Sequence, residues 1–281
     1  MSAKHTASST NTARMMKIKF KSLSSGSCGN CYFLGIFSED GRCDSSILID
    51  AGVSPRSLKN ELRKEGLSPD CIGGMLITHD HNDHIRSLGS YCKHLSYPVW
   101  SPARMRRAIA GKYYTGEHYY DCARTLEDGW NEIIPGKIKA RWFELPHDAA
   151  QTVGYAILLG QYKFVIMTDL GHITEQAAAF ASQADTVVIE SNYDLNMLKN
   201  GPYPRELKER IMNGSGHLSN IECASAIAAF DHEGLRNVFL CHLSEHNNTP
   251  ELALEASKTA INPAARLCAL PRTTASPLFE L

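Results

Sequence analysis

The stretch Met75-Leu76-Ile77-Thr78-His79-Asp80-His81-Asn82-Asp83-His84 decides the fold and the chemistry. Its first three residues form a short apolar run typical of a buried strand, and polar residues follow at once. Because side chains alternate along an extended segment, His79 and His81 point the same way and make half of a metal site. Asp83 and His84 continue into the next turn and can reach a second ion. The alternative is a His-rich surface loop, but four potential ligands within six positions at a strand end argue against it.

The ligand types narrow the choice of metal. Imidazole and carboxylate groups without thiolate favour Zn, Mn or Fe over soft metals. The chain has 9 Cys, an odd number, which favours free thiols over a disulfide framework. Cys28 and Cys31 form one close pair, but no second Cys-x-x-Cys completes a structural zinc site.

Composition indicates a soluble protein. Of the 281 residues 43% are hydrophobic, and Lys+Arg 29 against Asp+Glu 30 gives a net charge of −1. This balance excludes a wholly basic nucleic-acid coat and an acidic tail protein. No apolar stretch reaches the roughly 18 residues of a membrane span, and the first 15 residues lack the apolar core of a secretory signal. We therefore expect a cytoplasmic protein without a membrane partner.

The remaining pattern predicts one domain with two sheets and outer helices. Residues 1–14 are small, polar and without period, so we expect a disordered leader, followed by a single domain over 15–281. Strands are predicted over 16–20, 32–37, 46–50, 75–77, 138–145, 154–159, 164–168, 186–189 and 238–241. Helices are predicted over 54–67, 102–111, 174–183, 203–212, 219–230 and 250–260. Residues 24–30, rich in Ser and Gly, are predicted to form a loop.

The chain resembles the metallo-β-lactamase-fold hydrolases. The shared pattern is the His79-x-His81-x-Asp83-His84 motif, followed by single ligands, each after a strand: His147, Asp169 and His242. Asp50 matches an early aspartate of the family that orients ligands. The resemblance covers residues 16 to about 260 and implies an α/β (α+β) chain folded as a four-layer αββα sandwich.

The resemblance also implies a centre with two divalent metal ions. His79, His81 and His147 would hold one ion, and Asp83, His84 and His242 the other, with Asp169 bridging them. Such a pair of ions polarises the scissile group and lowers the pKa of a bridging water from about 16 toward 7, giving hydroxide at neutral pH. A lone His147 or His242 would more often be an ordinary loop histidine, but together with the first motif we interpret both as ligands.

Finer motifs resemble the bacterial YycJ/WalJ group. They are Ser24-Ser25-Gly26-Ser27-Cys28-Gly29-Asn30, Gly216-His217-Leu218-Ser219-Asn220, and His242-Leu243-Ser244 with Asn247-Asn248. This resemblance implies a nuclease with 5′-to-3′ exonuclease activity on DNA and a role in DNA repair.

His217 stands in a Gly-Ser-Gly-His stretch just before a predicted helix, where glycines allow close backbone approach and a helix N-terminus attracts anions. We expect His217 and Ser219 to bind the scissile phosphate, and His217 to protonate the leaving oxygen, so that it joins Asp83 as a catalytic residue. The alternative for Ser219 is a helix cap completed by Glu222, and both roles can hold together.

Two further segments are candidates for contact with nucleic acid. Ser27 and Asn30 lie in the predicted Ser/Gly loop, which could present N–H groups to phosphate or be a plain turn. Residues 104–120 mix cations with aromatics, as in Arg104-Met105-Arg106-Arg107 and Tyr113-Tyr114, and would suit a nucleic-acid strand. A solvated helix face beside a Tyr-rich packing loop is the alternative.

The sequence therefore predicts a metal-dependent phosphodiester hydrolase acting on nucleic acid, specifically a 5′-to-3′ DNA exonuclease. A small-molecule hydrolase of the same fold, cleaving a thioester, lactone or small phosphodiester, is the alternative. A degenerate scaffold is disfavoured because all seven ligands are present. The metal, Zn, Mn or Fe, and the oligomeric state stay open.

Overall fold

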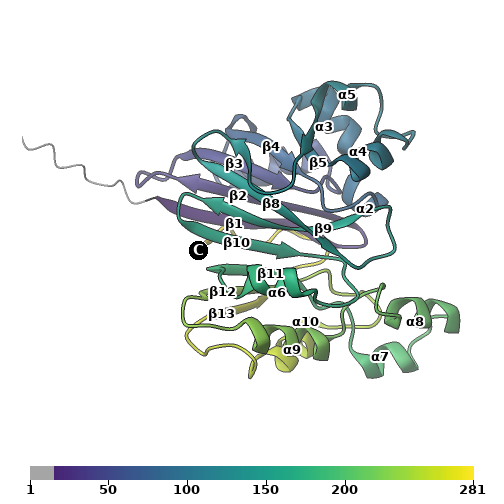
Figure 1. Ribbon diagram of the computed structural model, residues 1–281. Helices are drawn as coiled ribbons and strands as arrows, with labels where there is room; N and C mark the ends of the chain where they lie inside the picture. The colour runs from purple at the N-terminus through teal and green to yellow at the C-terminus, as the bar shows by residue number, and fades with distance from the viewer. Residues whose placement is uncertain (1–15) are drawn as a thin grey trace, which may run out of the picture.

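Two seven-stranded sheets form the centre of the protein, as the computed structural model of residues 16–281 shows (Figure 1). The predicted leader over 1–14 lies outside these described residues. The first sheet has the order β14 (Phe279–Glu280), β1 (Lys17–Gly26), β2 (Gly29–Phe37), β3 (Cys43–Ile49), β4 (Ile72–Leu76), β5 (Val99–Pro102), β6 (Ala123–Leu126). The second has the order β13 (Arg266–Ala269), β12 (Asn237–Cys241), β11 (Thr186–Glu190), β10 (Tyr162–Met167), β9 (Thr152–Leu159), β8 (Ile138–Leu145), β7 (Asn131–Ile134).

Helices cover the outer faces of both sheets. On the first sheet these include α3 (Leu88–Leu95), α4 (Ala103–Ala110) and α5 (His118–Cys122), at the top of Figure 1. On the second they are α6 (Glu175–Ala181), α9 (Asn220–Phe230) and α10 (Pro250–Ser257). The other helices are α1 (Pro55–Lys64), the short α2 (Asn82–Ile85), and α7 (Leu195–Asn200) with α8 (Arg205–Met212) at one end. This arrangement confirms the predicted αββα sandwich.

The main hydrophobic core lies between the sheets. Phe20 of β1 packs with its ring centroid 5.4 Å from Phe164 of β10 and 5.1 Å from Phe239 of β12. All three side chains are fully buried. A second apolar cluster lies between the second sheet and α6, α9 and α10. Because burial of each such aromatic ring contributes roughly 2–3 kcal/mol, this core fixes the position of the strand ends that carry the site.

The strand pairing brings many carboxyl ends to one edge. β3, β4, β5 and β6 are parallel neighbours in the first sheet, and β10, β11, β12 and β13 in the second. The predicted meander over 138–168 is confirmed, since β8, β9 and β10 pair antiparallel. β8 therefore runs in the direction of β10.

The prediction of a loop over residues 24–30 was wrong. β1 continues through Gly26 and β2 begins at Gly29, so that only residues 27 and 28 form the turn. The serines tolerate burial because their hydroxyls are paired: Ser25 Oγ lies 2.8 Å from Tyr32 Oη, and Ser24 Oγ donates to the Arg272 carbonyl. The sequence analysis also missed β5 and the edge strands β6, β7, β13 and β14, which are too short to show a period.

Within residues 16–281, no helix is both long enough and apolar enough to cross a membrane.

Candidate metal centre

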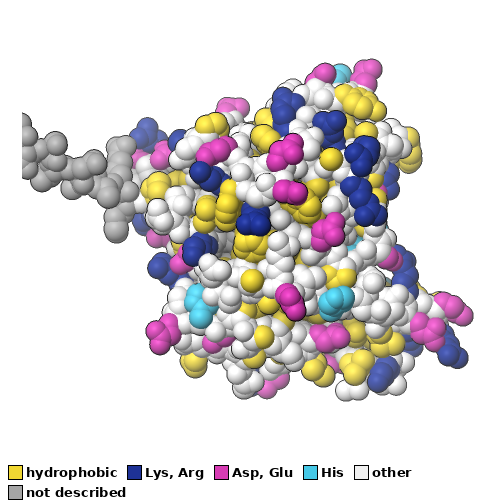
Figure 2. All heavy atoms as spheres, in the orientation of Figure 1, with side chains coloured by type: hydrophobic (Ala, Val, Ile, Leu, Met, Phe, Trp, Pro, Cys, Tyr) yellow, Lys and Arg dark blue, Asp and Glu magenta, His cyan; other side chains and the backbone are white. Residues whose placement is uncertain are grey.

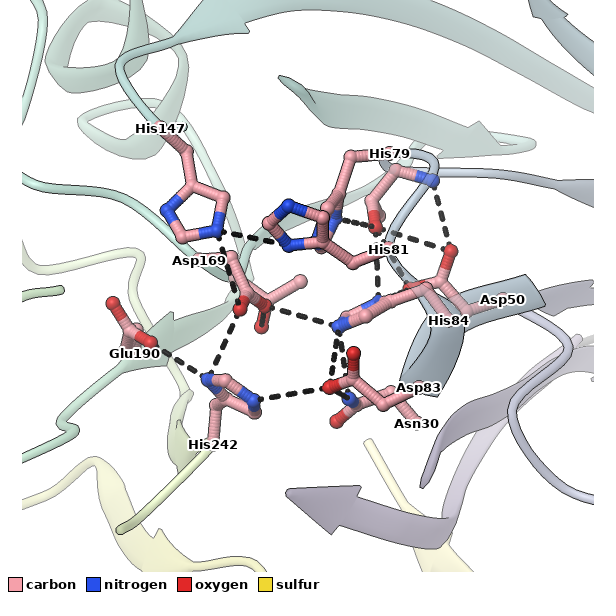
Figure 3. A network of polar contacts seen from close by, with 12 residues as sticks. Asn30, Asp50, His79, His81, Asp83, His84, His147, Asp169, Glu190 and His242 are labelled. Atoms are coloured by element: carbon pink, nitrogen blue, oxygen red, sulfur yellow. Dashed lines mark hydrogen bonds and ion pairs between the residues drawn. The ribbon is translucent and has the colours of Figure 1, made fainter. Parts of the chain in front are cut away.

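The candidate site lies at the edge where the strands of both sheets end (Figure 3). The polar residues arrive in turn: Asp50 after β3, His79 to His84 after β4, His147 after β8, Asp169 after β10, Glu190 as the last residue of β11, and His242 after β12. Parallel strands place their carboxyl ends together, which is the usual location of a site in such sheets. The structure thus brings all seven predicted ligands together.

The backbone at this edge is held in an unusual conformation. Asp50, Asp169 and His242 have positive φ angles of 64°, 56° and 52°, in the left-handed region that non-glycine residues rarely adopt. Ser96 is the one other such non-glycine residue in the part of the chain that the structure describes. Strain of this kind persists where the surroundings over-determine the conformation, as they do at functional sites. Asp50, Asp169 and His242 each follow a strand and turn their side chains into the site.

Close packing of the loops requires glycine. A Cβ on Gly52 would lie 1.8 Å from the Asp83 carbonyl oxygen and 2.4 Å from the Asn30 nitrogen. A side chain at this position would push the loop after β3 away from the ligand loop. Gly52 therefore lets Asp50 reach His84.

The ligand atoms form two overlapping groups. His79, His81 and His147 offer nitrogens within 4.8 Å of one another, and Asp83, His84 and His242 form a second group. Asp169 lies between them: its carboxylate is 3.3 Å from His84 Nε2, 3.9 Å from His147 Nε2 and 3.2 Å from His242 Nδ1. The spacing matches the division into two ligand sets with a shared aspartate.

These residues fit divalent ions. The Nε2 atoms of His79 and His242 are buried and have no hydrogen-bond partner among the described residues. A buried polar atom without a partner costs about 1–3 kcal/mol, which binding of a cation would offset. Burial holds the pKa of His79 well below its usual range, so this imidazole is neutral, the form that ligates metal.

Each of four ligand histidines is oriented through its other ring nitrogen. His84 Nδ1 donates to Asp50 Oδ2 at 2.7 Å, and His147 Nδ1 donates to the Gly216 carbonyl at 2.8 Å. His79 Nδ1 lies 3.1 Å from the Thr78 hydroxyl, which itself donates to Asp50. Such partners fix the tautomer and the ring direction of a ligand. Asp50 therefore positions two ligand histidines, one directly and one through Thr78.

Glu190 orients the fourth of these histidines and was missed by the sequence analysis. It is fully buried, and its Oε1 accepts from both His242 Nδ1 and His217 Nδ1 at 2.8 Å. Oε2 accepts from two backbone N–H groups, at Leu170 and Leu218. The available signal was its position: Glu190 ends a predicted strand, as the ligands do.

His217 and Glu190 shift each other's pKa in opposite directions. Burial lowers the pKa of His217, but the Glu190 carboxylate outweighs this effect and the net pKa is raised. Burial raises the pKa of Glu190, but the two histidines hold it below its usual range. Glu190 is therefore ionised and His217 protonated over a wider pH range than in water.

Asp169 is kept ionised in the same way. Burial would raise its pKa, but His242 and His84 hold the pKa well below its usual range. The pKa of Asp83 is likewise lowered, because His84 and His242 outweigh the effect of burial. Both groups are carboxylates, the form in which they can bind a cation.

A cavity of about 420 Å³ opens onto the ligands. Its wall includes His81, Asp83, His147, Asp169, His217 and His242. Arg210 and Tyr203, from the α7–α8 region, and His246 also line it. Arg210 forms an ion pair with Asp148, next to His147. The cavity is therefore open, polar and charged.

Of the four residues expected to contact phosphate, two line the cavity and two do not. Ser27 and His217 line the cavity. Asn30 Nδ2 donates to Asp83 Oδ2 at 3.1 Å and lies 2.8 Å from His84 Nε2. Ser219 forms the cap of α9, with Glu222 completing the capping box as the alternative predicted, and does not line this cavity. Its hydroxyl lies 2.6 Å from the Glu222 carboxylate.

The four-layer sandwich with a His/Asp cluster at one shared edge defines the metallo-β-lactamase class. The chain belongs to the beta-lactamase superfamily, since a model described as "Beta-lactamase superfamily domain" matches residues 45–243. It is 30% identical over 235 residues to exodeoxyribonuclease WalJ of Streptococcus pneumoniae serotype 2, covering 84% of this chain and 85% of that protein. It is 31% identical over 238 residues to exodeoxyribonuclease YycJ of Bacillus anthracis, covering 85% and 87%. These findings confirm the predicted family.

Solved structures agree on the fold. The metallo-β-lactamase fold protein YhfI from Bacillus subtilis superposes with a TM-score of 0.66 at 16% identity, over 95% of this chain and 100% of that chain. Unliganded yeast PDE1 gives a TM-score of 0.71 at 13% identity, over 94% and 100%.

Proposed function

We propose that this protein is a metal-dependent exonuclease that hydrolyses phosphodiester bonds of DNA from the 5′ end. The observation that carries the proposal is the His217–Glu190 pair, which lies beside the ligand cluster and faces the same cavity. Phosphodiester hydrolysis needs a proton for the leaving alkoxide, and a histidine with a raised pKa supplies one near neutral pH. The relatives named as exodeoxyribonucleases support the same choice.

The seven predicted ligands would hold two divalent ions, Zn, Mn or Fe, with Asp169 shared between them. When bound, the ions supply Lewis acidity toward the phosphate and an activated water. Asp50 and Glu190 would fix the ring orientations of the ligands His84 and His242 through hydrogen bonds.

His217 would act through its free nitrogen. Its Nδ1 donates to Glu190, which leaves Nε2 as the atom that can deliver a proton to the leaving oxygen. Glu190 stabilises the protonated ring before transfer and keeps the ring in place after it. Ser27 lines the same cavity and would contact a bound phosphate. Asn30 is buried and donates to Asp83 Oδ2, so it would hold this ligand in position.

We place this activity in a single domain from residue 15 onward, in the cytoplasm and in DNA repair. All nine cysteines are free, which supports a reducing compartment.

The test is degradation of 5′-phosphorylated DNA and RNA, single- and double-stranded, by metal-stripped protein restored with Mn or Zn. Asp169→Ala protein serves as the control, and each reaction is run at low and high salt. Release of nucleotides from the 5′ end of DNA, dependent on metal and lost in the control, is the expected result. Turnover of a small ester or phosphodiester with no cleavage of any strand would instead indicate the small-molecule hydrolase.

A further inference from the structure

The outer face of α4 carries three arginines without partners. Arg104, Arg106 and Arg107 are exposed, and no ion pair or hydrogen bond involves their side chains within residues 16–281. Other cations of the described chain are paired with carboxylates, among them Lys64 with Glu61 and Arg205 with Glu209. Figure 2 shows dark-blue side chains gathered over the region where Figure 1 places α3 and α4.

The position of these arginines in α4 does not stabilise the helix. Cations near a helix N-terminus oppose the helix dipole, and the first turn of α4 contains no acidic residue to compensate Arg104. Like charges spaced three residues apart, as Arg104 and Arg107 are, also repel. These arginines slightly lower the stability of the helix and have no partner within the described residues. Such a cluster can bind an external polyanion.

An exposed aromatic side chain follows this cluster along the chain. Tyr113, in the turn that follows α4, is 95% exposed and is the most exposed large hydrophobic residue of the described chain. The turn is well held: Thr115 Oγ1 donates to the Ile109 and Lys112 carbonyls, and a Cβ on Gly89 would lie 2.5 Å from the Thr115 carbonyl oxygen. Tyr113 is thus presented to solvent by a fixed turn, as a platform on which a nucleobase can stack.

The same segment is tied to both ligand loops. Lys112 Nζ pairs at 2.9 Å with Asp80, which stands between the ligands His79 and His81. Asp80 also accepts from the Ala150 N–H, three residues after His147. At the start of α4, the Met105 N–H donates to Gln151 Oε1. The cations and Tyr113 therefore have a fixed position relative to the metal centre.

We propose that Arg104, Arg106, Arg107 and Tyr113, here named the α4 patch, hold the single-stranded part of the nucleic acid that leads into the metal centre. The arginines contact phosphates, and Tyr113 stacks on an unpaired base. This inference rests on the proposed function and deepens it by naming the surface that binds the strand. It also explains how a chain with a net charge of −1 can bind a polyanion: the cations needed are concentrated on one surface.

The test measures binding of a fluorescent oligonucleotide, both single-stranded and as a duplex, in EDTA, so that no strand is cut. The variants are the triple change R104A/R106A/R107A, Tyr113→Ala and Tyr113→Phe. Lys163→Ala is the matched control, because Lys163 is exposed at the start of β10, the end opposite to Asp169.

We expect binding by the triple variant to depend less steeply on salt, with the slope of log K against log salt shallower by roughly 2 for three lost phosphate contacts. Tyr113→Ala should weaken binding about tenfold, while Tyr113→Phe, which keeps the ring, should bind like the wild type. Lys163→Ala should match the wild type. In the cleavage assay with metal, the triple change should raise KM for the oligonucleotide far more than it lowers kcat.

Binding of the triple variant within twofold of the wild type, with an unchanged salt slope, would overturn the proposal. Equal loss of single-strand and duplex binding, with no effect of Tyr113→Ala, would show a duplex-backbone surface and overturn the single-strand assignment. Failure of wild-type protein to degrade any nucleic acid is a separate result, which removes the proposed function whatever the binding data show.

Discussion

The metal centre and the α4 patch differ in where their charged groups lie and in whether these groups are paired. In the centre, Asp169 and Glu190 are buried and Asp83 is partly buried, and each carboxylate lies against histidines. On the patch, three arginines stand in solvent without a partner among the described residues. A buried charge needs an opposite charge or hydrogen-bond donors beside it to offset its loss of hydration, and these contacts hold it in one position. An exposed charge keeps its hydration and can attract an oppositely charged partner from a distance.

The difference assigns separate tasks to the two regions. A change in the centre should reduce the rate of the chemical step, and a change on the patch should reduce affinity for the strand.

Asp169→Asn should abolish measurable cleavage, because the neutral amide cannot serve as the carboxylate shared by both ligand groups. Elemental analysis of the purified protein should show fewer bound ions per chain than in the wild type. Asp44→Asn is the control, since Asp44 is exposed at the start of β3, away from the ligands. Full metal content together with full activity in Asp169→Asn protein would break the assignment of the centre.

His217→Ala should lower kcat about 10²-fold or more while leaving KM for the strand close to the wild-type value, because the proton donor is lost but the patch is intact. The measurement is steady-state cleavage of a 5′-phosphorylated strand, with metal content determined in parallel. Unchanged turnover at full metal content would remove His217 from the chemistry.

Glu190→Gln should move the alkaline limb of the pH–rate profile to lower pH. His217 is active as an acid when protonated, and Glu190 raises its pKa in the folded protein, so wild-type activity falls as pH rises through that raised value. The stabilising effect of the pair follows the same sign: it is complete below the unfolded pKa of about 6.5 and is lost as pH rises through the folded pKa. An unmoved limb would show that another group supplies the proton.

Ser219→Ala should cost about 1 kcal/mol of the free energy of unfolding, because the capping box of α9 is lost. Thermal or urea unfolding would measure this change. We expect little effect on KM, since the hydroxyl is paired with Glu222. A rise in KM of tenfold or more would instead support the phosphate contact expected from the sequence.

The fold and the clustering of the seven candidate ligands were predictable because the information is local. His79, His81, Asp83 and His84 are adjacent in sequence, and His147, Asp169 and His242 each follow an apolar run that reads as a strand. Glu190 also follows a predicted strand, but nothing in the sequence links it to its partners His217 and His242, which are 27 and 52 residues away. Its role depends on parallel pairing of β11 with β10 and β12, which only the tertiary structure shows.

Short and polar strands were hidden for a different reason. Ser24 and Ser25 look like loop residues, but their hydroxyls are paired with Arg272, far away in the chain, and with Tyr32 of the neighbouring strand, so β1 extends through them. For the arginines of α4 the sequence left two interpretations open. The structure adds that their side chains have no partner among the described residues and that the turn carrying Tyr113 is fixed to the ligand loops.

The most direct test of this division of tasks is steady-state kinetics on one single-stranded DNA substrate with three proteins: wild type, His217→Ala and the triple arginine variant of the α4 patch. We predict a large fall in kcat with little change in KM for His217→Ala, and a large rise in KM with little change in kcat for the triple variant. If His217→Ala changed only KM, or if the triple variant changed only kcat, the division between a centre that performs the chemistry and a patch that holds the strand would be contradicted.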